Sequence, residues 1–297
     1  MNQSSTHRFS FGLIGWPVSH SLSPHIHQAA FQATGLHGEY LLYPVVPTTT
    51  HEQKQNTLLD RLRDGTLHGL NVTVPHKERA LRWVDRLSAT ARAVGAVNTL
   101  SLQKNELVGD NTDVQGFLNH LSRLKLLIPG EPRRCLILGA GGSARAAAFA
   151  LAQAGHPVAI AARRIEQAIS LAEHLNRSPA VTTPIEALNF DPDFIQRQYS
   201  PEILVNTTPV GMHPDTEQSP WPLEIPLPQG CLVYDMIYNP AETQLLLAAR
   251  RQGLPAINGL GMLVEQAALS FTIWTGIQPP LEPLYQAVGL NLASIEP

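Results

Sequence analysis

A glycine-rich turn near the middle of the chain has the spacing of a phosphate-binding loop. Residues 139–144 read Gly139-Ala140-Gly141-Gly142-Ser143-Ala144, which fits the pattern G-x-G-x-x-G/A. An apolar run precedes this turn and an alanine-rich segment follows it. In such a strand–turn–helix unit the first glycine permits the turn, the second lets the backbone approach a pyrophosphate, and the alanine lets the helix pack closely. The segment predicts a dinucleotide site, and an ordinary strand-to-helix turn is the alternative.

Two arginines, Arg163 and Arg164, follow the next apolar run. A site for NAD usually carries an acidic residue there, which binds the ribose hydroxyls. Guanidinium groups instead suit a 2′-phosphate, which they hold with paired N–H donors. The pair therefore favours NADP, and two solvated surface arginines are the alternative.

Polar residues also gather where strand-like runs end in the first half of the chain. Four segments share this placement: 15–24, 71–77, 95–99 and 109–113. In open α/β sheets such strand ends form the ligand crevice. Taken singly, Lys77 would be a surface lysine, Asp113 a loop or capping residue, and Ser23 the cap of a helix opening at Pro24.

Together these segments suit oxidation of a secondary alcohol, which needs a hydride acceptor and a group that takes the hydroxyl proton. Lys77 lies two residues after Pro75, which is expected to open a helix. A helix N-terminus disfavours a positive charge, whereas a neighbouring Asp113 would favour it and hold the amine in place. The sequence leaves open which effect dominates.

The elements that must position these residues alternate between strands and helices in the first half. Expected strands are 9–15, 39–45, 69–74, 96–102 and 106–108. Expected helices are 24–34, 51–64, one opening at Pro75, and 88–94. Residues 104 and 105 form the turn of a hairpin.

The second half alternates more strictly. Expected strands are 135–138, 158–162, 203–206 and 232–235, and expected helices are 142–154, 165–176, 241–252 and 260–275. Short, continuously apolar strands between amphipathic helices predict a parallel sheet covered on both faces. Proline-rich stretches at 209–228 and 278–283 are expected to be loops.

Composition limits the classes of partner. The 297 residues carry a net charge of −3 with no basic cluster, which argues against nucleic acid. The sequence contains no run of eighteen apolar residues, so no membrane span is expected. The first residues are polar, which predicts a cytoplasmic protein. Cys135 and Cys231 are expected to be buried strand residues, with a disulfide possible on count alone.

Twelve histidines raise the question of a metal site. His20, His25 and His27 cluster in the sequence, but His25 and His27 are two residues apart and do not share a helix face. No carboxylate or cysteine joins them at ligand spacing, so no metal is expected. His76 and His213 are expected to be loop or surface residues.

The ordered motifs resemble the shikimate dehydrogenase family over nearly the full chain. The first four motifs are S-x-S-x-S-P within 19–24, N-V-T-x-P-x-K at 71–77, G-A-V-N-T at 95–99 and G-x-N-T-D at 109–113. The glycine-rich loop comes next, followed by N-T-T-P-V-G at 206–211, Y-D-M-I-Y at 234–238 and G-L-G-M-L-V-E-Q at 259–266. Eight motifs in this order are far more specific than any one of them.

The resemblance implies the residues of a substrate site. Lys77 and Asp113 would be the catalytic pair, and Ser21 and Ser23 would bind the substrate carboxylate. Thr73, Asn98 and Gln266, together with the catalytic pair, would surround the ring hydroxyls, and Tyr238 would close over the site.

The resemblance also implies a cofactor site. It would use Gly139, Ala140, Gly141, Gly142, Ser143, Ala144, Arg145, Arg163, Arg164, Thr207, Thr208, Met236, Gly259 and Met262. The chain departs from the family at the adenosine end, where N-R-T is common and this sequence reads Ala162-Arg163-Arg164. The details of 2′-phosphate binding are therefore open.

The expected architecture is an α/β protein of two domains with a cleft between them. Residues 1–112 with 260–297 would form the α/β substrate-binding catalytic domain, and 113–259 a Rossmann-type doubly wound parallel-sheet domain for NADP. The expected activity is the reversible, NADP-dependent reduction of 3-dehydroshikimate to shikimate in aromatic amino-acid (chorismate) biosynthesis, by a monomer or homodimer.

Two other activities stay open. One is an NAD-dependent quinate/shikimate dehydrogenase with the same pocket motifs. The other is a non-catalytic sensor of a dinucleotide and a ring acid, against which the retention of both Lys77 and Asp113 argues. A purely structural role would leave the polar residues at the strand ends without a purpose.

Overall fold

The computed structural model describes residues 8–47, 52–127 and 130–292. The chain divides into two compact units, Met1–Gly116 with Leu263–Pro297, and Phe117–Met262. Both division points fall inside helices, α4 (Asp113–Arg123) and α9 (Leu260–Thr275). Among the residues described, no helix is long and apolar enough to cross a membrane.

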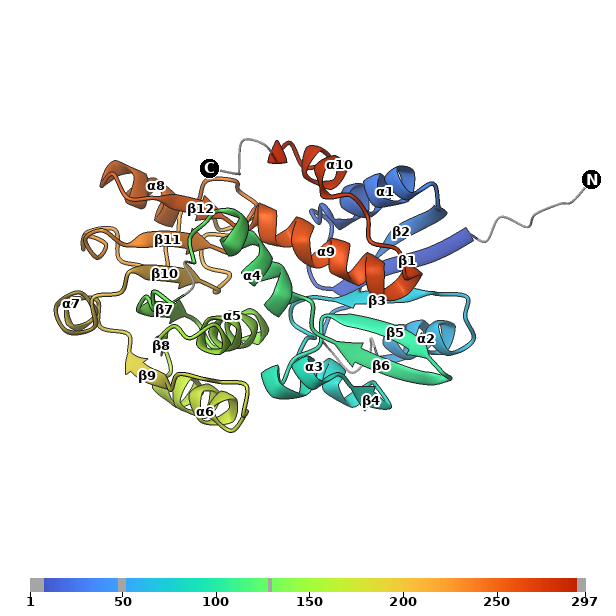
Figure 1. The fold of residues 1–297 in the computed structure, drawn as a ribbon, viewed down its shortest axis with the longest axis horizontal. Helices are drawn as coiled ribbons and strands as arrows, with labels where there is room; N and C mark the ends of the chain where they lie inside the picture. The colour runs from blue at the N-terminus through green and yellow to red at the C-terminus, as the bar shows by residue number, and fades with distance from the viewer. Residues whose placement is uncertain (1–7, 48–51, 128–129, 293–297) are drawn as a thin grey trace, which may run out of the picture. The chain divides into compact units, whose positions relative to one another are not determined.

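The first unit is built on a mixed sheet with the strand order β2-β1-β3-β5-β6-β4 (Figure 1). Its strands are β1 (Arg8–Gly15), β2 (His37–Pro44), β3 (Gly69–Val72), β4 (Arg86–Leu87), β5 (Thr99–Gln103) and β6 (Glu106–Asp110). β1 runs parallel to β2 and β3, whereas β5 runs antiparallel to β3 and β6. The carboxyl ends of β1 and β3 therefore lie at one edge of the sheet, beside the start of β5.

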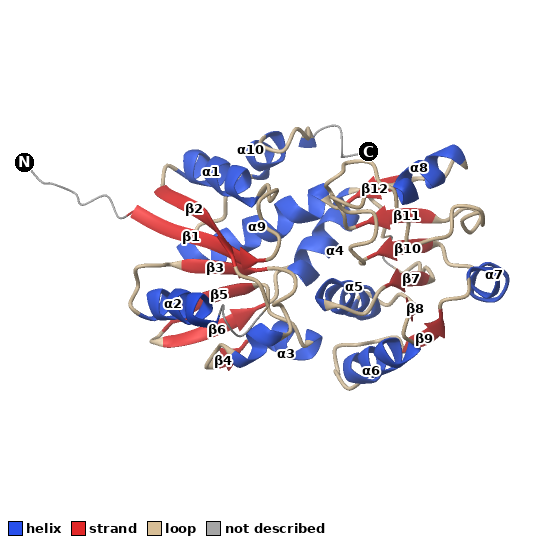
Figure 2. Ribbon diagram, turned by 180° about the vertical axis from the view of Figure 1, so that it is seen from behind, coloured by secondary structure: helices blue, strands red, loops and turns tan. Residues whose placement is uncertain are grey.

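Helices cover both faces of this sheet (Figure 2). They are α1 (Ser23–Thr34), α2 (Glu52–Arg63), α3 (Ala89–Val94), the part of α9 in this unit and α10 (Leu281–Gln286). Side chains alternate between the faces along β1. Phe11 and Leu13 pack with α1, α9 and α10, whereas Ile14 packs with α2 and α3.

Two expectations for this unit need correction. Pro75 does not open an α-helix, because β3 is followed by turns and then by a short 3₁₀ helix, Arg79–Arg82. After Pro75 the helical pattern of apolar residues continues for little more than one turn, which is too short for a stable α-helix. The proline-rich stretch 278–283 is also not all loop, because α10 begins at Leu281. The expected start of α2 at residue 51 lies outside the described residues.

His76 lies in the loop after β3, as one of the two expected placements, but it is buried rather than exposed. Its Nε2 lies 2.7 Å from the carbonyl oxygen of Val45, and its ring lies against Trp83. The loop after β3 therefore turns inward at this residue. His213 is exposed, as expected.

The second unit contains a fully parallel sheet with the strand order β12-β11-β10-β7-β8-β9. The strands are β7 (Cys135–Leu138), β8 (Val158–Ala162), β9 (Ile185–Asn189), β10 (Ile203–Asn206), β11 (Leu232–Asp235) and β12 (Ala256–Asn258). Within this sheet β7 comes first in the sequence, and β8 and β9 follow towards one edge. β10 then lies on the other side of β7, and β11 and β12 follow towards the opposite edge. This doubly wound order places a ligand crevice at the carboxyl ends of β7 and β10 and confirms the expected α/β fold.

The remaining elements are α5 (Gly142–Gln153), α6 (Ile165–Asn176), α7 (Pro192–Phe194), the π-helical turn Ile195–Tyr199 and α8 (Gln244–Arg251). β9 and β12 were not expected from the sequence. β9 has only one fully buried residue, and β12 has three half-buried ones, so neither shows the apolar run of the central strands.

Cys135 and Cys231 are buried and free, which confirms their interpretation as small apolar residues and excludes a disulfide between them in this structure. Burial raises the pKa of the Cys231 thiol to about 12, and it raises the pKa of Cys135 as well. Both thiols are therefore poor nucleophiles at neutral pH.

A buried histidine lies in the core of the first unit. His27, on α1, is fully buried and stacks on the Tyr40 ring with centroids 4.2 Å apart. Phe271 and Trp274 of α9 flank it. Neither ring nitrogen makes a hydrogen bond among the described residues. Burial lowers the pKa of His27 to about 3, and the Asn71 side chain only partly offsets this shift.

This pKa predicts an acid-sensitive core. Below the ordinary histidine pKa the unfolded chain binds a proton that the folded protein excludes, so stability falls as the pH drops from about 6.5 towards 3. The loss amounts to roughly 2 kcal/mol at pH 5. His27→Phe should remove it, and urea unfolding of both proteins at pH 7 and pH 5 measures the difference. Equal losses in both proteins would contradict the prediction.

Candidate functional site

A buried ion pair lies at the carboxyl edge of the first sheet. The Nζ atom of Lys77 is 2.6 Å from Oδ2 of Asp113, and the two side chains are only 13% and 6% exposed. Lys77 lies in the loop after β3, where its carbonyl oxygen accepts a hydrogen bond from Val97 N–H. Asp113 is the first residue of α4, and its own N–H donates to Asn111. Sequence reasoning expected both residues at one site, and the fold brings them into direct contact.

The surroundings of Lys77 differ from the expectation in one respect. Because no α-helix begins at Pro75, the helix dipole expected from that segment is absent. The charge that acts on it is the Asp113 carboxylate. The ammonium group is therefore held in place by a paired charge inside the protein.

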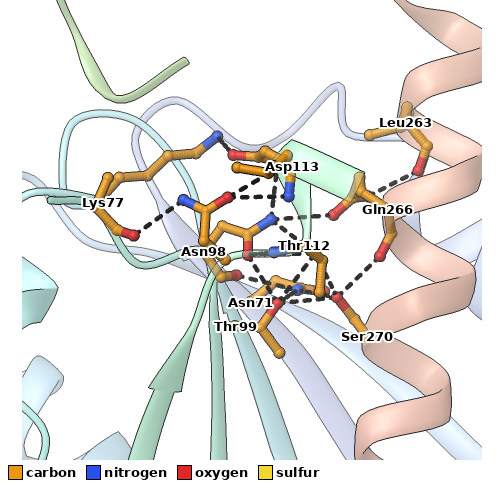
Figure 3. Close-up of polar contacts among 12 residues, drawn as sticks. Asn71, Lys77, Asn98, Thr99, Thr112, Asp113, Leu263, Gln266 and Ser270 are labelled. Carbon is orange, nitrogen blue, oxygen red and sulfur yellow. Dashed lines mark hydrogen bonds and ion pairs between the residues drawn. The ribbon is translucent and has the colours of Figure 1, made fainter. Parts of the chain in front are cut away.

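Two further predicted residues join this pair (Figure 3). Asn98 donates from Nδ2 to Oδ1 of Asp113 at 2.8 Å, and the same nitrogen is 3.5 Å from Oε1 of Gln266. Gln266 donates from its own Nε2 to the carbonyl oxygen of Leu263. Gly116 allows this approach, since a Cβ there would lie 2.8 Å from the Gln266 backbone nitrogen. With Lys77, side chains from four separate motifs thus meet within hydrogen-bonding distance.

Behind these residues lies a second layer that sequence reasoning did not single out. It consists of Asn71, Thr99, Thr112 and Ser270, all of which are buried. Asn71 donates to Thr99, to Ser270 and to the carbonyl oxygen of Asn98. The motifs N-V-T, N-T and N-T-D already contain the first three residues, which is the signal that could have found them. Ser270 lies one helical turn after Gln266 and has no such signal.

Ser21 and Ser23 are close together at the start of α1. The Ser21 hydroxyl donates to the Ser23 hydroxyl at 3.2 Å, and the Ser23 N–H donates back to Ser21. Leu22 occupies the N-cap position, and no side-chain hydrogen bond caps the helix. The interpretation of Ser23 as the capping residue is therefore wrong.

Thr73 lies directly after β3, where its N–H donates to the Ile14 carbonyl oxygen. Its methyl group packs so closely on Gly15 that a side chain at that position would collide with it. Tyr238, the remaining predicted substrate residue, belongs to the second unit and lies half-buried after β11.

In the second unit the glycine-rich loop has the geometry that a pyrophosphate needs. Gly139 has a φ of 107°, a conformation that favours glycine, and a Cβ there would lie 2.8 Å from the Thr207 hydroxyl. Gly141 faces open space, with no atom within 4 Å of the place where its Cβ would be. α5 begins at Gly142 with no side-chain cap. Its first N–H groups are therefore available to an anion.

The loop after β10 is fixed beside this turn. Thr207 donates to the Leu138 carbonyl oxygen at 2.6 Å, and Thr208 donates to the side chain of Asn206. Asn206 in turn donates to the buried carboxyl group of Asp235 at 2.9 Å. Burial raises the pKa of Asp235 to about 6, against the opposing effect of its hydrogen bonds. Asp235 thus ties the loops after β10 and β11 together.

Met236, Gly259 and Met262 follow β11 and β12 at the same edge of the sheet. A side chain at Gly259 would collide with the Met236 carbonyl oxygen, so only glycine fits there. Met262 is buried near the start of α9. Arg163 and Arg164 follow β8 and are both exposed, and Arg164 occupies the N-cap of α6 without a side-chain cap. All the predicted cofactor residues therefore lie after parallel strands of one sheet.

Within the described residues, no group of three or more histidine, cysteine or acidic side chains could hold a metal ion. Of the three clustered histidines, His25 is exposed and His27 is buried against Tyr40. Their ring positions therefore do not converge.

Comparison with known proteins identifies the family. The model described as "Shikimate dehydrogenase substrate binding domain" matches residues 13–100, and "Shikimate 5'-dehydrogenase C-terminal domain" matches residues 259–288. The shikimate dehydrogenase (NADP(+)) of Methanopyrus kandleri is 39% identical over 279 residues, which cover 93% of each chain.

Solved structures agree. The shikimate 5-dehydrogenase of Thermus thermophilus, in complex with NADP(H) and shikimate, is similar with a TM-score of 0.80 and 33% identity over 97% of this chain and 99% of that one. The shikimate 5-dehydrogenase of Listeria monocytogenes, in complex with shikimate and NAD, has a TM-score of 0.82 and 30% identity, with the same shares of the two chains covered. With its ordered motifs, its two α/β units and full-length relatives of this kind, the chain belongs to the shikimate dehydrogenase family.

Proposed function

We propose that this protein is an NADP-dependent shikimate dehydrogenase that interconverts 3-dehydroshikimate and shikimate. The observation that carries the proposal is the buried Lys77–Asp113 pair, with Asn98 beside it, in a chain whose relatives bear this name. We assign the substrate to residues 1–112 with 260–297 and the cofactor to residues 113–259. Aromatic amino-acid biosynthesis is the pathway that this activity serves.

The substrate side needs groups for one carboxylate and several ring hydroxyls. We assign the carboxylate to the hydroxyls of Ser21 and Ser23, which are not used for capping. Thr73, Asn98 and Gln266 offer hydroxyl and amide groups for the ring, and we assign Tyr238 to the substrate as well. Such neutral donors bind and orient the substrate, whereas Lys77 and Asp113 also exchange protons.

The reaction requires a proton and a hydride to leave the same alcohol. A nicotinamide cofactor held by the second unit would supply the hydride acceptor for the carbon atom. In the reduction of 3-dehydroshikimate the Lys77 ammonium group gives a proton to the carbonyl oxygen as it becomes a hydroxyl group, and in the oxidation of shikimate the neutral amine takes the hydroxyl proton back. The contact between the two side chains keeps the amine aimed at one point. Asn98 fixes the other carboxylate oxygen, so the pair cannot rotate away.

The cofactor side fits a dinucleotide on the chain's own geometry. The free N–H groups at the start of α5, the open space at Gly141 and the turn at Gly139 suit the pyrophosphate. The residues assigned to this loop are Gly139, Ala140, Gly141, Gly142, Ser143, Ala144 and Arg145. Thr207, Thr208, Met236, Gly259 and Met262 line the nicotinamide half, and Arg163 and Arg164 bind the 2′-phosphate.

An NAD-dependent quinate/shikimate dehydrogenase is the second candidate, and the Listeria relative in complex with NAD is the observation in its favour. A non-catalytic sensor would not need the Lys77–Asp113 pair. Initial rates with shikimate and quinate, each with NADP and with NAD, distinguish all three functions. Turnover of shikimate with NADP at the highest kcat/KM supports the proposal, a preference for NAD moves it to the alternative, and no turnover favours the sensor.

We also propose a cytoplasmic location, which the two buried, unpaired cysteines support because cytosolic thiols stay reduced. A monomer or homodimer that needs no nucleic acid and no membrane would be sufficient for this activity.

Replacement of Lys77 tests the chemistry. Lys77→Ala should lower kcat by about 100-fold or more and change the KM for shikimate much less, because proton transfer occurs mainly in the transition state. Lys54→Ala, at an exposed lysine of α2, is the matched control and should leave kcat unchanged. Steady-state rates of both variants measure the effect. A Lys77→Ala enzyme with nearly normal kcat would remove Lys77 from the mechanism.

Replacement of the two serines tests recognition of the carboxylate. Ser21→Ala and Ser23→Ala should each weaken shikimate binding by about 1–3 kcal/mol, the scale of a hydrogen bond to a charged group. Ser88→Ala is the contrasting control. Ser88 caps α3 by accepting a hydrogen bond from Ala91, so its loss should lower the melting temperature but not shikimate affinity. Normal shikimate affinity in both test variants, measured by calorimetry, would refute the assignment.

Replacement of Arg163 tests cofactor choice. A charge-assisted contact with the 2′-phosphate is worth about 1.5–3 kcal/mol, or roughly 10- to 150-fold in affinity. Arg163→Ala should raise the KM for NADP by that factor and leave the KM for NAD nearly unchanged. Added salt should weaken NADP binding more in the wild type than in the variant.

Arg251→Ala is the matched control for this charge. Arg251 is exposed at the end of α8, which leads into the amino end of β12 and so lies at the opposite edge of the sheet. Its loss should change neither KM. Equal losses for both cofactors in Arg163→Ala would mean that Arg163 supports the adenine or the fold instead of the phosphate.

A further inference from the structure

The hydroxyl group of Ser270 lies at the junction of four elements in the first unit (Figure 3). Ser270 is on α9, is fully buried, and donates to the Gln266 carbonyl oxygen one turn earlier at 3.0 Å. Its oxygen lies 2.9 Å from Asn71 Nδ2 on β3, 2.9 Å from Thr99 Oγ1 on β5 and 3.1 Å from Thr112 Oγ1 before α4. One side-chain atom therefore links α9 to the strands and to the start of α4.

The number of protons restricts how these bonds can form. A serine hydroxyl donates one proton and accepts at two lone pairs. The Gln266 carbonyl can only accept and the Asn71 amide nitrogen can only donate, so they take the proton and one lone pair. A single lone pair remains for two threonine hydroxyls. At most one threonine can therefore donate to Ser270, and the other must donate elsewhere.

Asn98 provides the other acceptor. Its Oδ1 accepts from the Thr112 N–H at 2.8 Å and lies 3.0 Å from Thr99 Oγ1 and 3.2 Å from Thr112 Oγ1. If Thr99 donates to Asn98 and Thr112 donates to Ser270, each hydroxyl proton has one acceptor. The Thr112 oxygen then accepts from Asn98 Nδ2 at 2.9 Å. Because the Thr112 N–H can only donate, the amide oxygen of Asn98 must face it, and the amide nitrogen faces Asp113.

We infer that Ser270 is a positioning residue for the reaction, acting through Thr112 and Asn98 on the Asp113 carboxylate. Ser270 takes the Thr112 proton, Thr112 holds the Asn98 nitrogen, and Asn98 holds the oxygen of Asp113 that Lys77 does not. This inference rests on the proposed function only in its kinetic consequence. The hydrogen-bond arrangement itself involves only residues of the first unit.

Loss of the Ser270 hydroxyl has a specific consequence. The Thr112 proton would then compete with that of Thr99 for one lone pair of Asn98, and the Asn98 amide would no longer have a single favoured orientation. Asp113 would lose a fixed donor while keeping its contact with Lys77. The expected result is a slower chemical step with an unchanged KM for NADP, because none of these atoms belongs to the unit with the glycine-rich loop.

The test compares Ser270→Ala with Thr272→Ala in the full-length protein. Thr272 lies on the same helix and donates to the Ala268 carbonyl oxygen in the same i−4 manner, and none of the network bonds given above involves it. Ser270→Ala should lower kcat for shikimate with NADP about 10-fold, the order expected when a buried polar group loses its partner. The KM for NADP should stay constant, and Thr272→Ala should stay within about twofold of wild type.

A second readout is hydrogen exchange of the Asn98 side-chain amide, followed by NMR and assigned with Asn98→Asp. Ser270→Ala should speed this exchange, and Thr272→Ala should not. Ser270→Cys serves the same test if Ser270→Ala does not fold, since the thiol has nearly the same shape and is a weak hydrogen-bonding group.

The outcomes separate the two proposals. Wild-type kcat in Ser270→Ala, or equal losses in Ser270→Ala and Thr272→Ala, would overturn the role of Ser270. A wild-type protein that does not turn over shikimate would overturn the proposed function instead. In that case unchanged exchange of the Asn98 amide in the Ser270 variant would overturn this inference too, and faster exchange would support it.

Discussion

The buried contact between Lys77 and Asp113 is the interaction on which the first unit depends. Removing two charges from water costs several kcal/mol per ion, which their attraction offsets only if the geometry is good and the remaining lone pairs are satisfied. Asn98 satisfies one of these lone pairs, and a layer of uncharged amides and hydroxyls then satisfies Asn98. Gly116 lets α4 approach α9 closely enough to close this layer. The pair of charges therefore requires polar side chains in the layer behind Asn98 as well as Asn98 itself.

The second unit differs, because at its glycine-rich loop the charge belongs to the assigned ligand. Here the chain offers backbone N–H groups at the start of α5, and glycine at 139 and 141 keeps the approach free of side chains. Asp235, a buried carboxyl group, lies behind the loops, where it joins Asn206 to Thr243. Its raised pKa shows how strongly burial opposes ionisation even with these partners. The hydrogen bonds of Asp235 hold the loops from behind, and the surface that faces the ligand stays free of side chains.

The sequence by itself determined the family and the parallel sheet, and it named the candidate site residues. The central strands of the second unit were predictable because they are buried on both faces and read as short apolar runs, as in 135–138 and 203–206. The marginal strands β9 and β12 were missed because edge strands bury little. Lys77, Asp113 and Asn98 could be named because they lie in motifs at strand ends. No single residue among them would have been identified by its type.

Only the tertiary structure decided which of these residues touch, and in what order. The sequence placed both a helix dipole at Pro75 and the Asp113 carboxylate beside Lys77 and left open which dominates, whereas the fold places turns at Pro75 and Asp113 in direct contact with Lys77. No sequence pattern indicated Ser270, which is 199 residues from Asn71 along the chain but accepts a hydrogen bond from it. His76 was expected in a loop or at the surface, and it lies in a loop whose burial only the packing of that loop decides. Hydrogen-bond partners distant in sequence are set by the packing of α9 and the loops on the sheet, which local patterns do not encode.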